Sequence, residues 1–407
     1  MSGCRSVFGR GVRNRLALPL GELGPSRCPP DLACERGETF LGTCPVEKCR
    51  RSQIGLFTMS FATPDGYLKE ARALPVAGAS ARPRIRLVED AREVPVLGGV
   101  RSPLPLDSLS PLRYPGSKRK LLPALRQIIE ANHDSPLDLF VEPFCGGASV
   151  SLGLLELGVI KHALIADFDP LIAAFWMEAT ARPEQLVRAM YRQPPTLANW
   201  DKWRAAQPRK TSQRALKCLF LNRTTFSGII GGTAGPIGGR AQTSEYTIDC
   251  RFNKEQLAKR IRRIGELAAD GRLLTPSEGT WQDTLRLVDG WAADLGAKSV
   301  VIYLDPPYVE KAHHLYDRPF SRTDHENLAA SLLNEQRHWI LSYDKVPLVL
   351  GLYGHFADIH EYSVLHHYTV KGQRDGSVPG REVIFTNLPT VPADSSSPEP
   401  ARKDATR

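Results

Sequence analysis

Four short apolar runs, each with an acid at or near its end, constrain the fold of this chain more than any other feature of its sequence. They occupy residues 137–143, 162–170, 299–308 and 338–344. A segment with helical periodicity and a glycine stop, 148–158, follows the first run. Strands that alternate with helices predict an α/β fold with a parallel, doubly wound sheet. Because ligands bind such sheets at the carboxyl ends of the strands, the acids predict an active site at that edge.

The composition is that of a globular protein with a modest excess of positive charge. The chain has 407 residues, 42% hydrophobic and 24% charged, with 53 Lys+Arg against 44 Asp+Glu. These proportions exclude wholesale disorder, and no apolar run approaches the ~18–20 residues of a membrane span. Eight cysteines are too few for a disulfide scaffold, which favours a reducing compartment. We therefore expect a cytoplasmic protein without membrane association, and its net charge of +9 is compatible with a nucleic-acid partner.

Residues 1–110 differ in composition from the rest of the chain. They are rich in arginine, proline and glycine, show little periodicity, and contain five of the eight cysteines. These cysteines lack paired C-x₂-C spacing and have no histidine among them, which makes a zinc site the least favoured interpretation. We expect an N-terminal extension that is either a disordered arm or the result of a misplaced start, with translation beginning at Met59. At the other end, residues 389–407 are predicted to be a disordered tail.

The third apolar run is followed directly by Asp305, Pro306, Pro307 and Tyr308. The two prolines stiffen the turn and lack N–H groups, so the Asp carboxylate and a Pro carbonyl form a pair of acceptors. Such a pair suits an exocyclic NH₂ group, and the Tyr ring offers a face on which a base can stack. Methylation of an amino nitrogen such as adenine N6 needs this arrangement, because its lone pair is delocalised until two acceptors draw the hydrogens out of plane. The competing interpretation is a Pro-Pro turn with Asp305 as an incidental cap.

A glycine turn and a second acid form a pattern that suits a nucleoside. Gly146 and Gly147 follow the first strand and let the backbone approach a ligand closely, although such a turn serves many nucleotide-binding folds. An acid about twenty residues further on, at the end of the next strand, can bind both ribose hydroxyls of an adenosyl ligand. Asp169, which precedes Pro170, suits a helix N-cap. Asp167 is therefore the predicted ribose ligand.

These segments, taken in chain order, resemble the Dam-like family of DNA adenine-N6 methyltransferases (D12 class, alpha group). Residues 114–118 are similar to the family's aromatic-x-Gly-Gly-Lys segment, with Ser117 in place of the second glycine. Residues 141–146 are similar to its Val-Glu-Pro-Phe-x-Gly segment, although Ala148 stands where many members have glycine. The Asp-Pro-Pro-Tyr motif at 305–308 is unchanged. The resemblance extends over about two thirds of the chain, from 113 to 388.

The resemblance implies a Rossmann-like class I methyltransferase fold that binds S-adenosyl-L-methionine and needs no metal. The implied cofactor contacts are Tyr114, Lys118, Glu142, Phe144, Gly146, Asp167 and Asp305. The implied catalytic group is Asp305, Pro306, Pro307 and Tyr308, acting on a flipped adenine, because N6 inside the base stack cannot be approached in line by a methyl donor. The implied catalytic domain comprises residues 111–180 and 296–388, and a mainly helical target-recognition insert occupies 181–295.

The insert carries the predicted DNA contacts. Asn222, Arg223 and Thr224 can supply polar contacts to base edges or phosphates, while Leu221 is expected in the core. Phe226 is expected in the core too, with packing against the duplex as the alternative. Six glycines between 228 and 239 predict a mobile loop that orders on DNA. A helix at 252–268 is predicted to bury Leu257, Ile261, Ile264 and Leu267 and to expose a basic face, for which solvent and phosphate are equally open partners.

The leading hypothesis is a sequence-specific DNA adenine-N6 methyltransferase that acts on double-stranded DNA as a monomer and is associated with the nucleoid. An RNA adenine methyltransferase on the same scaffold is one alternative, and a catalytically silent DNA-binding module is another. Cytosine-N4 enzymes usually carry Ser before Pro-Pro-Tyr, which counts against that class. The recognition sequence and the existence of a cognate restriction endonuclease stay open at this stage.

Overall fold

The computed structural model describes residues 58–62, 68–72, 96–97, 110–113, 118–309, 320–367, 379–390 and 392. The chain forms two compact units, Met1–Pro75 and Val76–Arg407. In the first unit, β1 (Thr58–Ala62) and β2 (Leu68–Arg72) form an antiparallel pair. Most of the predicted N-terminal extension lies outside the described residues, and so does the predicted tail from 393 onward.

An eight-stranded sheet forms the centre of the second unit, with the strand order β3-β9-β10-β8-β7-β4-β5-β6. Five neighbouring strands, from β8 to β6, are parallel, while β10 runs antiparallel to both β8 and β9. In chain order the strands are β3 (Val96–Leu97), β4 (Leu137–Glu142), β5 (Ile160–Asp167), β6 (Ser277–Glu278), β7 (Val300–Leu304), β8 (His338–Asp344), β9 (His360–His367) and β10 (Pro379–Thr386). The four apolar runs are thus four neighbouring strands of a predominantly parallel sheet.

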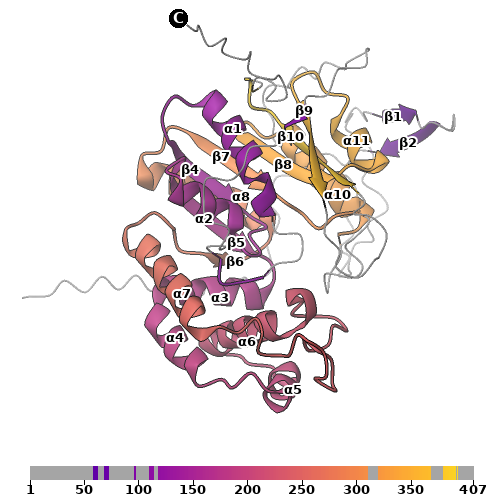
Figure 1. The fold of residues 1–407 in the computed structure, drawn as a ribbon. Helices are drawn as coiled ribbons and strands as arrows, with labels where there is room; N and C mark the ends of the chain where they lie inside the picture. The colour runs from indigo at the N-terminus through magenta and orange to yellow at the C-terminus, as the bar shows by residue number, and fades with distance from the viewer. Residues whose placement is uncertain are drawn as a thin grey trace, which may run out of the picture. The chain divides into compact units, whose positions relative to one another are not determined.

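Helices cover both faces of this sheet, because successive side chains of each strand point into opposite apolar clusters. In β4, Phe140 packs in one cluster with α1, α2 and α3, whereas Leu139 and Val141 pack in the other with α8, α10 and α11 (Figure 1). These helices are α1 (Leu122–Asn132), α2 (Ser149–Glu156), α3 (Pro170–Ala181), α8 (Trp281–Leu295), α10 (Arg322–Leu333) and α11 (Pro347–Tyr353). The two layers of helices confirm the predicted α/β, doubly wound architecture.

Between β5 and β6 the chain forms a helical insert, which gathers at one end of the sheet in Figure 1. It consists of α4 (Pro183–Tyr191), α5 (Leu197–Ala205), α6 (Thr211–Thr224), the short 3₁₀ helix η2 (Phe226–Gly228) and α7 (Lys254–Ala269). α3 packs against both α6 and α7, so insert and sheet share one apolar cluster. The range predicted for the insert, 181–295, extends beyond these helices, because β6 and α8 belong to the sheet and its covering layer.

The predicted amphipathic helix at 252–268 is α7. Its side chain-capping residue is Asn253, whose Oδ1 accepts a hydrogen bond from the backbone N–H of Gln256 at 3.0 Å. The four residues predicted to form its apolar face are all buried: Leu257, Ile261, Ile264 and Leu267. No helix in the described ranges combines the length and the apolarity that a membrane crossing requires.

Candidate active site

Three acids meet at the carboxyl edge of the parallel strands. Glu142 and Asp167 are the last residues of β4 and β5, and Asp305 directly follows β7. Because β4 lies between β5 and β7 and is parallel to both, the three strand ends share one edge. The strand order also reverses at β4, which is where open α/β sheets form a ligand crevice. The structure therefore brings together the acids that the sequence analysis singled out.

Asp138, near the start of β4, lies at the opposite edge of the sheet and has a different environment from the three acids. Asp138 accepts hydrogen bonds from Lys161 Nζ at 2.7 Å and from the backbone N–H groups of Lys298 and Ser299 at 2.8 and 3.0 Å. The bond from Lys161 is the largest of the effects that hold the pKa of Asp138 well below its usual range. Asp138 is thus a satisfied structural carboxylate that joins the beginnings of three strands.

At the carboxyl edge, by contrast, the pKa values of Glu142 and Asp167 are raised. Burial raises the pKa of Glu142 to about 8, although Ser151 donates hydrogen bonds from its hydroxyl and its backbone N–H to Glu142 Oε2. Burial likewise raises the pKa of Asp167 to about 7. Acids whose pKa values are raised in this way are candidates for a functional site.

The glycine turn after β4 orients Asp167. The backbone N–H of Gly146 donates to Asp167 Oδ2 at 2.8 Å, and the N–H of Asp169 donates to Oδ1 at 2.9 Å. Gly146 has a φ of 44°, and its carbonyl accepts a hydrogen bond from Trp176 Nε1 at 2.8 Å. A carboxylate has about four lone-pair sites, and the backbone N–H groups of Gly146, Phe168 and Asp169 bond to Asp167, so about one site stays open to a ligand. This geometry suits the predicted ribose ligand.

Ala148, which stands where many members of the resembled family have glycine, lies in the left-handed region. Its φ is 45° and its ψ is 33°, and its side chain is buried in the core. A Cβ in this conformation costs roughly 1–2 kcal/mol, which glycine avoids. Alanine in place of glycine at position 148 therefore adds backbone strain to the turn that follows β4.

Asp169 has the structural role that the sequence predicted. It is the N-cap of α3, and its Oδ1 accepts the backbone N–H of Leu171 at 2.7 Å. Pro170 occupies the first helical position, where a missing N–H costs nothing.

Asp305 has two hydrogen-bond donors, and both use the same oxygen. Lys118 Nζ lies 3.0 Å from Asp305 Oδ1, and Ser342 Oγ donates to Oδ1 at 2.9 Å. Within the described part of the chain, Oδ2 is therefore available to a substrate hydrogen. Burial raises the pKa of Asp305 to about 6, and the positive charge of Lys118 is the largest effect that opposes this rise.

Ser342 is a site residue that the sequence analysis did not assign. It lies in β8, next to β7, and shares a hydrogen bond of 2.9 Å with the Tyr303 hydroxyl in addition to its bond to Asp305. The signal was its position near the end of a predicted strand, where the acids also lie. A serine in an apolar strand has many roles, however, and only the pairing of β7 with β8 shows which one it has here.

Tyr308 lies beside Lys118, with its ring in an aromatic cluster. Lys118 Nζ is 4.3 Å from the Tyr308 ring centroid, and the Tyr308 and Tyr343 centroids are 6.3 Å apart. Pro306 is buried and Pro307 half-buried. Phe144, also half-buried, makes an edge contact with Phe320 at 5.7 Å between centroids. The predicted cofactor contact Tyr114 lies outside the described residues.

The three residues predicted to contact DNA are buried. Asn222 accepts the backbone N–H of Arg113 at 2.7 Å and donates to the carbonyls of Arg113 and Gly228 at 2.6 and 2.9 Å. Arg223 Nε donates to the Pro111 carbonyl at 2.7 Å, and Thr224 Oγ1 donates to the Phe220 carbonyl at 2.7 Å.

These contacts correct the expected role of the segment. Asn222 and Thr224 are 0% exposed and Arg223 is 7% exposed, so their side chains are not placed to reach a base edge. They are the last residues of α6, on a stretch buried from Ala215 onward. Asn222 and Arg223 bind the 110–113 segment, Asn222 also binds Gly228 of η2, and Thr224 bonds within α6 itself. The polar residues that looked like a recognition triplet in the sequence are internal connectors in the structure.

Phe226 reverses the other expectation for this segment. It was expected in the core, yet its side chain is 66% exposed, whereas Leu221 is fully buried as predicted. The reason is that α6 ends at Thr224, after which Thr225 is extended, so the helical spacing that would bury Phe226 no longer applies. Phe226 is therefore a surface residue of the insert and not part of its core.

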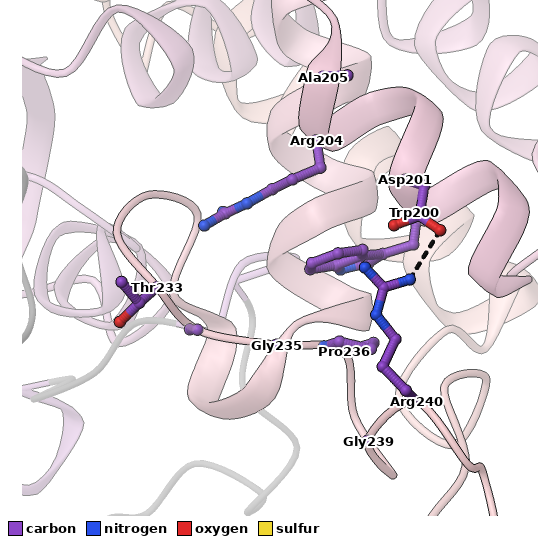
Figure 2. Close-up of a pocket in the computed structure, with 10 residues that line it drawn as sticks. Trp200, Asp201, Arg204, Ala205, Thr233, Gly235, Pro236, Gly239 and Arg240 are labelled. Atoms are coloured by element: carbon purple, nitrogen blue, oxygen red, sulfur yellow. Dashed lines mark hydrogen bonds and ion pairs between the residues drawn. The ribbon is translucent and has the colours of Figure 1, made fainter.

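A separate cavity of about 700 Å³ lies in the insert, beside Trp200 of α5 and the loop that follows η2. Figure 2 shows Arg204 reaching toward the part of the loop that carries Thr233, while Arg240 extends toward Trp200 and pairs with Asp201 at 2.7 Å. Arg204 donates to the carbonyl oxygens of Ile230, Gly231 and Gly232, so it fastens the glycine-rich loop to α5. None of the three edge acids lines this cavity. No group of three or more metal-ligating side chains comes together in the described ranges.

Comparison with known proteins gives one family match. The family model described as D12 class N6 adenine-specific DNA methyltransferase matches residues 114–255, a range that includes Lys118, Glu142 and Asp167 and ends before Asp305. No curated protein sequence matches this chain.

Two solved structures illustrate the structural similarities. One is a SAM-dependent methyltransferase from Agrobacterium tumefaciens, with 10% identity, coverage of 67% of this chain and 62% of that one, and a TM-score of 0.29. The other is the rRNA methyltransferase aviRa from Streptomyces viridochromogenes, with 17% identity, coverage of 67% and 85%, and a TM-score of 0.27. This chain thus spans less than two thirds of the length of the first of these structures.

The family match overlaps the sequence motifs in part. It covers the glycine turn and Asp167, and the sheet brings Asp305 to the same edge. Over residues 114–255 this chain is similar to the D12 class N6 adenine-specific DNA methyltransferases, as its sequence motifs predict.

Proposed function

We propose that this protein transfers a methyl group from S-adenosyl-L-methionine to the N6 amino group of adenine in double-stranded DNA. One observation carries the proposal. Asp305 lies at the sheet's ligand-binding edge, with Oδ1 held by Lys118 and Ser342 and with Oδ2 left to a substrate. Pro306, Pro307 and Tyr308 follow it and supply a carbonyl acceptor and an aromatic ring.

The residues at the edge fit the cofactor. When bound, S-adenosyl-L-methionine supplies an electrophilic methyl group on a positively charged sulfonium. Asp167 keeps a lone pair for a ribose hydroxyl, and the turn at Gly146 and Gly147 presents backbone without bulky side chains. Buried carboxylates such as Glu142 and Asp305 favour a cation beside them, since a positive charge offsets the cost of burying a negative one.

Asp305 and its neighbours prepare the target nitrogen. Asp305 Oδ2 and the Pro306 carbonyl accept the two amino hydrogens, which releases the N6 lone pair from the ring for attack on the methyl carbon. The ion pair with Lys118 keeps Asp305 ionised, so that it accepts rather than donates. The proton leaves N6 after the methyl group has been transferred, and Asp305 lies nearest to receive it. The Tyr308 ring holds the adenine plane against the acceptors.

The base must leave the duplex to reach this edge. Phe226 is an exposed apolar ring on the insert, and we assign it the contact with the bases that the buried Asn222, Arg223 and Thr224 cannot make. An apolar wedge of this kind can occupy a base step and lower the cost of extruding a nucleotide.

The decisive experiment is incubation of the purified protein with adenine-unmethylated genomic DNA and S-adenosyl-L-methionine, followed by single-molecule sequencing. N6-methyladenine confined to one short sequence is the expected result. Asp305→Ala should abolish the modification and leave DNA binding largely intact; activity within tenfold of the wild type would remove the role assigned to Asp305.

The same experiment separates the alternatives. Cofactor binding without any modified DNA base would transfer the proposal to an RNA adenine, which the fold accommodates equally well. The absence of both cofactor binding and modification would identify a DNA-binding module that retains the fold without the chemistry. Isothermal titration with S-adenosyl-L-methionine provides the cofactor measurement in each case.

A further inference from the structure

Arginine side chains from three parts of the chain converge on residues 110–113. Arg223, at the end of α6, donates from Nε to the Pro111 carbonyl at 2.7 Å. Arg260 of α7 approaches the Ser110 carbonyl at 3.4 Å. Arg113 belongs to the segment itself, and its backbone is held on both sides by Asn222. The cluster is therefore built on a fixed piece of backbone rather than on surface side chains alone.

Acidic partners are unevenly distributed among the arginines in this part of the chain. Arg262 and Arg263 of α7 pair with Glu184 and Glu156, at 2.6 and 2.7 Å. In the described ranges, no carboxylate forms an ion pair with Arg113 or Arg223, nor with Arg251 in the loop before α7. Arg113 Nη1 is buried and has no hydrogen-bond partner among the described residues.

Burial makes this excess of positive charge costly. Arg223 is only 7% exposed. Burial, followed by the charges of Arg260, Arg113 and Arg251, lowers its pKa to about 9. Burial and the charge of Arg251 also lower the pKa of Arg113. A fold that buries a cation without a counter-charge loses several kcal/mol, which a bound anion would restore.

The chemistry and the access of the cluster suit a phosphate. Guanidinium groups present planar, paired N–H donors that match phosphate oxygens, and Arg251 is exposed, so a ligand can enter from solvent. Lys118, which pairs with Asp305, is five residues beyond Arg113. Five residues of chain reach at most roughly 18 Å. A phosphate bound here therefore lies within a few nucleotides of a base held at Asp305.

We propose that Arg113, Arg223 and Arg251 form a phosphate-binding site that holds a backbone phosphate of the nucleic-acid substrate close to the target nucleotide. This assignment rests on the proposed function for the identity of the ligand, and on the unpaired arginines for its chemistry. It also gives Arg223 a role as a phosphate ligand and not as a reader of bases.

The test measures duplex binding without requiring catalysis. The probe is a fluorescent duplex of G·C pairs only, which contains no adenine to methylate, titrated at chloride concentrations from 50 to 300 mM. The variant is Arg113→Gln/Arg251→Gln, and the matched control is Arg286→Gln on α8, an exposed arginine that pairs with Asp283. The double variant should lower the affinity about tenfold and reduce the slope of log K against log [salt] by about one. The control should stay within twofold of the wild type.

Two further measurements distinguish a failure of the phosphate site from a failure of the proposed function. Titration with S-adenosyl-L-methionine should give the same affinity for both variants as for the wild type. Inorganic phosphate, compared with chloride at equal ionic strength, should raise the thermal unfolding midpoint of the wild type but not that of the double variant.

Each outcome has a defined meaning. Equal salt slopes and equal phosphate effects in the wild type and the double variant would overturn the site. Phosphate stabilisation without any duplex binding would overturn the assignment to a nucleic-acid backbone and remove DNA from the proposed function. Loss of duplex affinity in the double variant would support the site, even if the wild type proved unable to methylate DNA.

Discussion

Asp138 and Glu142 lie four residues apart on one strand, yet their pKa values move in opposite directions. Asp138 receives a lysine and two backbone N–H donors, whereas the hydrogen bonds from Ser151 do not offset the burial of Glu142. We therefore interpret Asp138 as an acid that stabilises the sheet and Glu142 as an acid available to a ligand. Sequence alone shows only that both residues are acidic and flank apolar positions.

Methyl transfer should depend on pH through Asp305. The carboxylate accepts the amino hydrogens only when ionised, so the rate should fall as the pH decreases through about 6. Lys118→Met removes the positive charge that lowers this pKa, and the acidic limb of kcat/KM against pH should move upward by about one unit. Lys161→Met, which breaks the pair with Asp138 at the opposite edge, should leave the limb unchanged. A Lys118→Met profile that coincides with the wild type would contradict this role.

Glu142 should make the protein without cofactor less stable as the pH rises. Its folded-state pKa of about 8 exceeds the usual 4.5, so the folded state binds more protons and loses stability between these values. Glu142→Gln should reduce the decline in the free energy of unfolding between pH 5 and pH 8 by roughly 2–4 kcal/mol. Urea unfolding at several pH values measures this decline. Glu130→Gln, at an exposed pair with Arg126, should not alter it, and a Glu142→Gln curve as steep as the wild type would refute the assignment.

At the scale of elements, the end of α6 connects the insert to the segment that leads to Lys118. Gly228 has a φ of 80°, and a Cβ placed there would lie 2.5 Å from the Arg113 carbonyl oxygen. Asn222 bridges the two backbones at the same place. These contacts join the insert to residue 113, which is more than a hundred positions away in sequence.

Asn222→Ala should destabilise the protein by about 2–4 kcal/mol, because it leaves the part-buried N–H and carbonyl of Arg113 and the buried carbonyl of Gly228 without partners. Urea unfolding of the purified variant gives the value. Asn334→Ala, which removes an exposed bond to the Ala330 carbonyl, should stay within about 0.5 kcal/mol of the wild type. A loss of stability no larger for Asn222→Ala than for this control would show that the bridge contributes little.

Elements with periodic apolar residues or a capping residue can be predicted from the sequence. The exposure of a side chain that depends on the local backbone conformation cannot. The strand ends at Glu142, Asp167 and Asp305 and the buried face of α7 follow from apolar spacing, and Asp169 caps α3 as expected. Phe226 could not be placed, because its exposure depends on the extended residue that ends α6. Long-range contacts, such as Asn222 with Arg113, leave no local pattern in a single sequence.

At the scale of the whole molecule, the division of the chain predicts which part is dispensable. Every described site residue lies in the second unit, Val76–Arg407. Removing residues 1–75 should therefore leave the methyl-transfer rate within about twofold and the thermal unfolding midpoint of the second unit within a few degrees. Calorimetry and the genomic DNA assay give both values. A loss of activity greater than tenfold with an unchanged unfolding midpoint would assign the first unit a part in the reaction.

The boundaries of the insert show the limit of sequence analysis at this scale. β6 has only two residues, Ser277 and Glu278, so it carries no apolar run by which a strand could be recognised. Its pairing with β5 moves the end of the insert to the region after α7. The predicted insert, 181–295, therefore includes a strand and a helix that the structure groups with the sheet.

The position of β7 beside β4 also determines the order in which the protein can assemble during synthesis. Phe140 pairs with Ala163 soon after both emerge from the ribosome, but its other neighbour, Val301, follows only after the whole insert has been made. At ~5–20 residues per second, the 138 residues from Ala163 to Val301 take roughly 7–28 s, during which this edge of β4 has no partner. Contacts of such large sequence separation slow folding, and an unpaired apolar strand is a target for aggregation. The nascent chain therefore passes through a stage in which the helical insert is complete and the catalytic edge is not, and chaperones have their opportunity to bind at that stage.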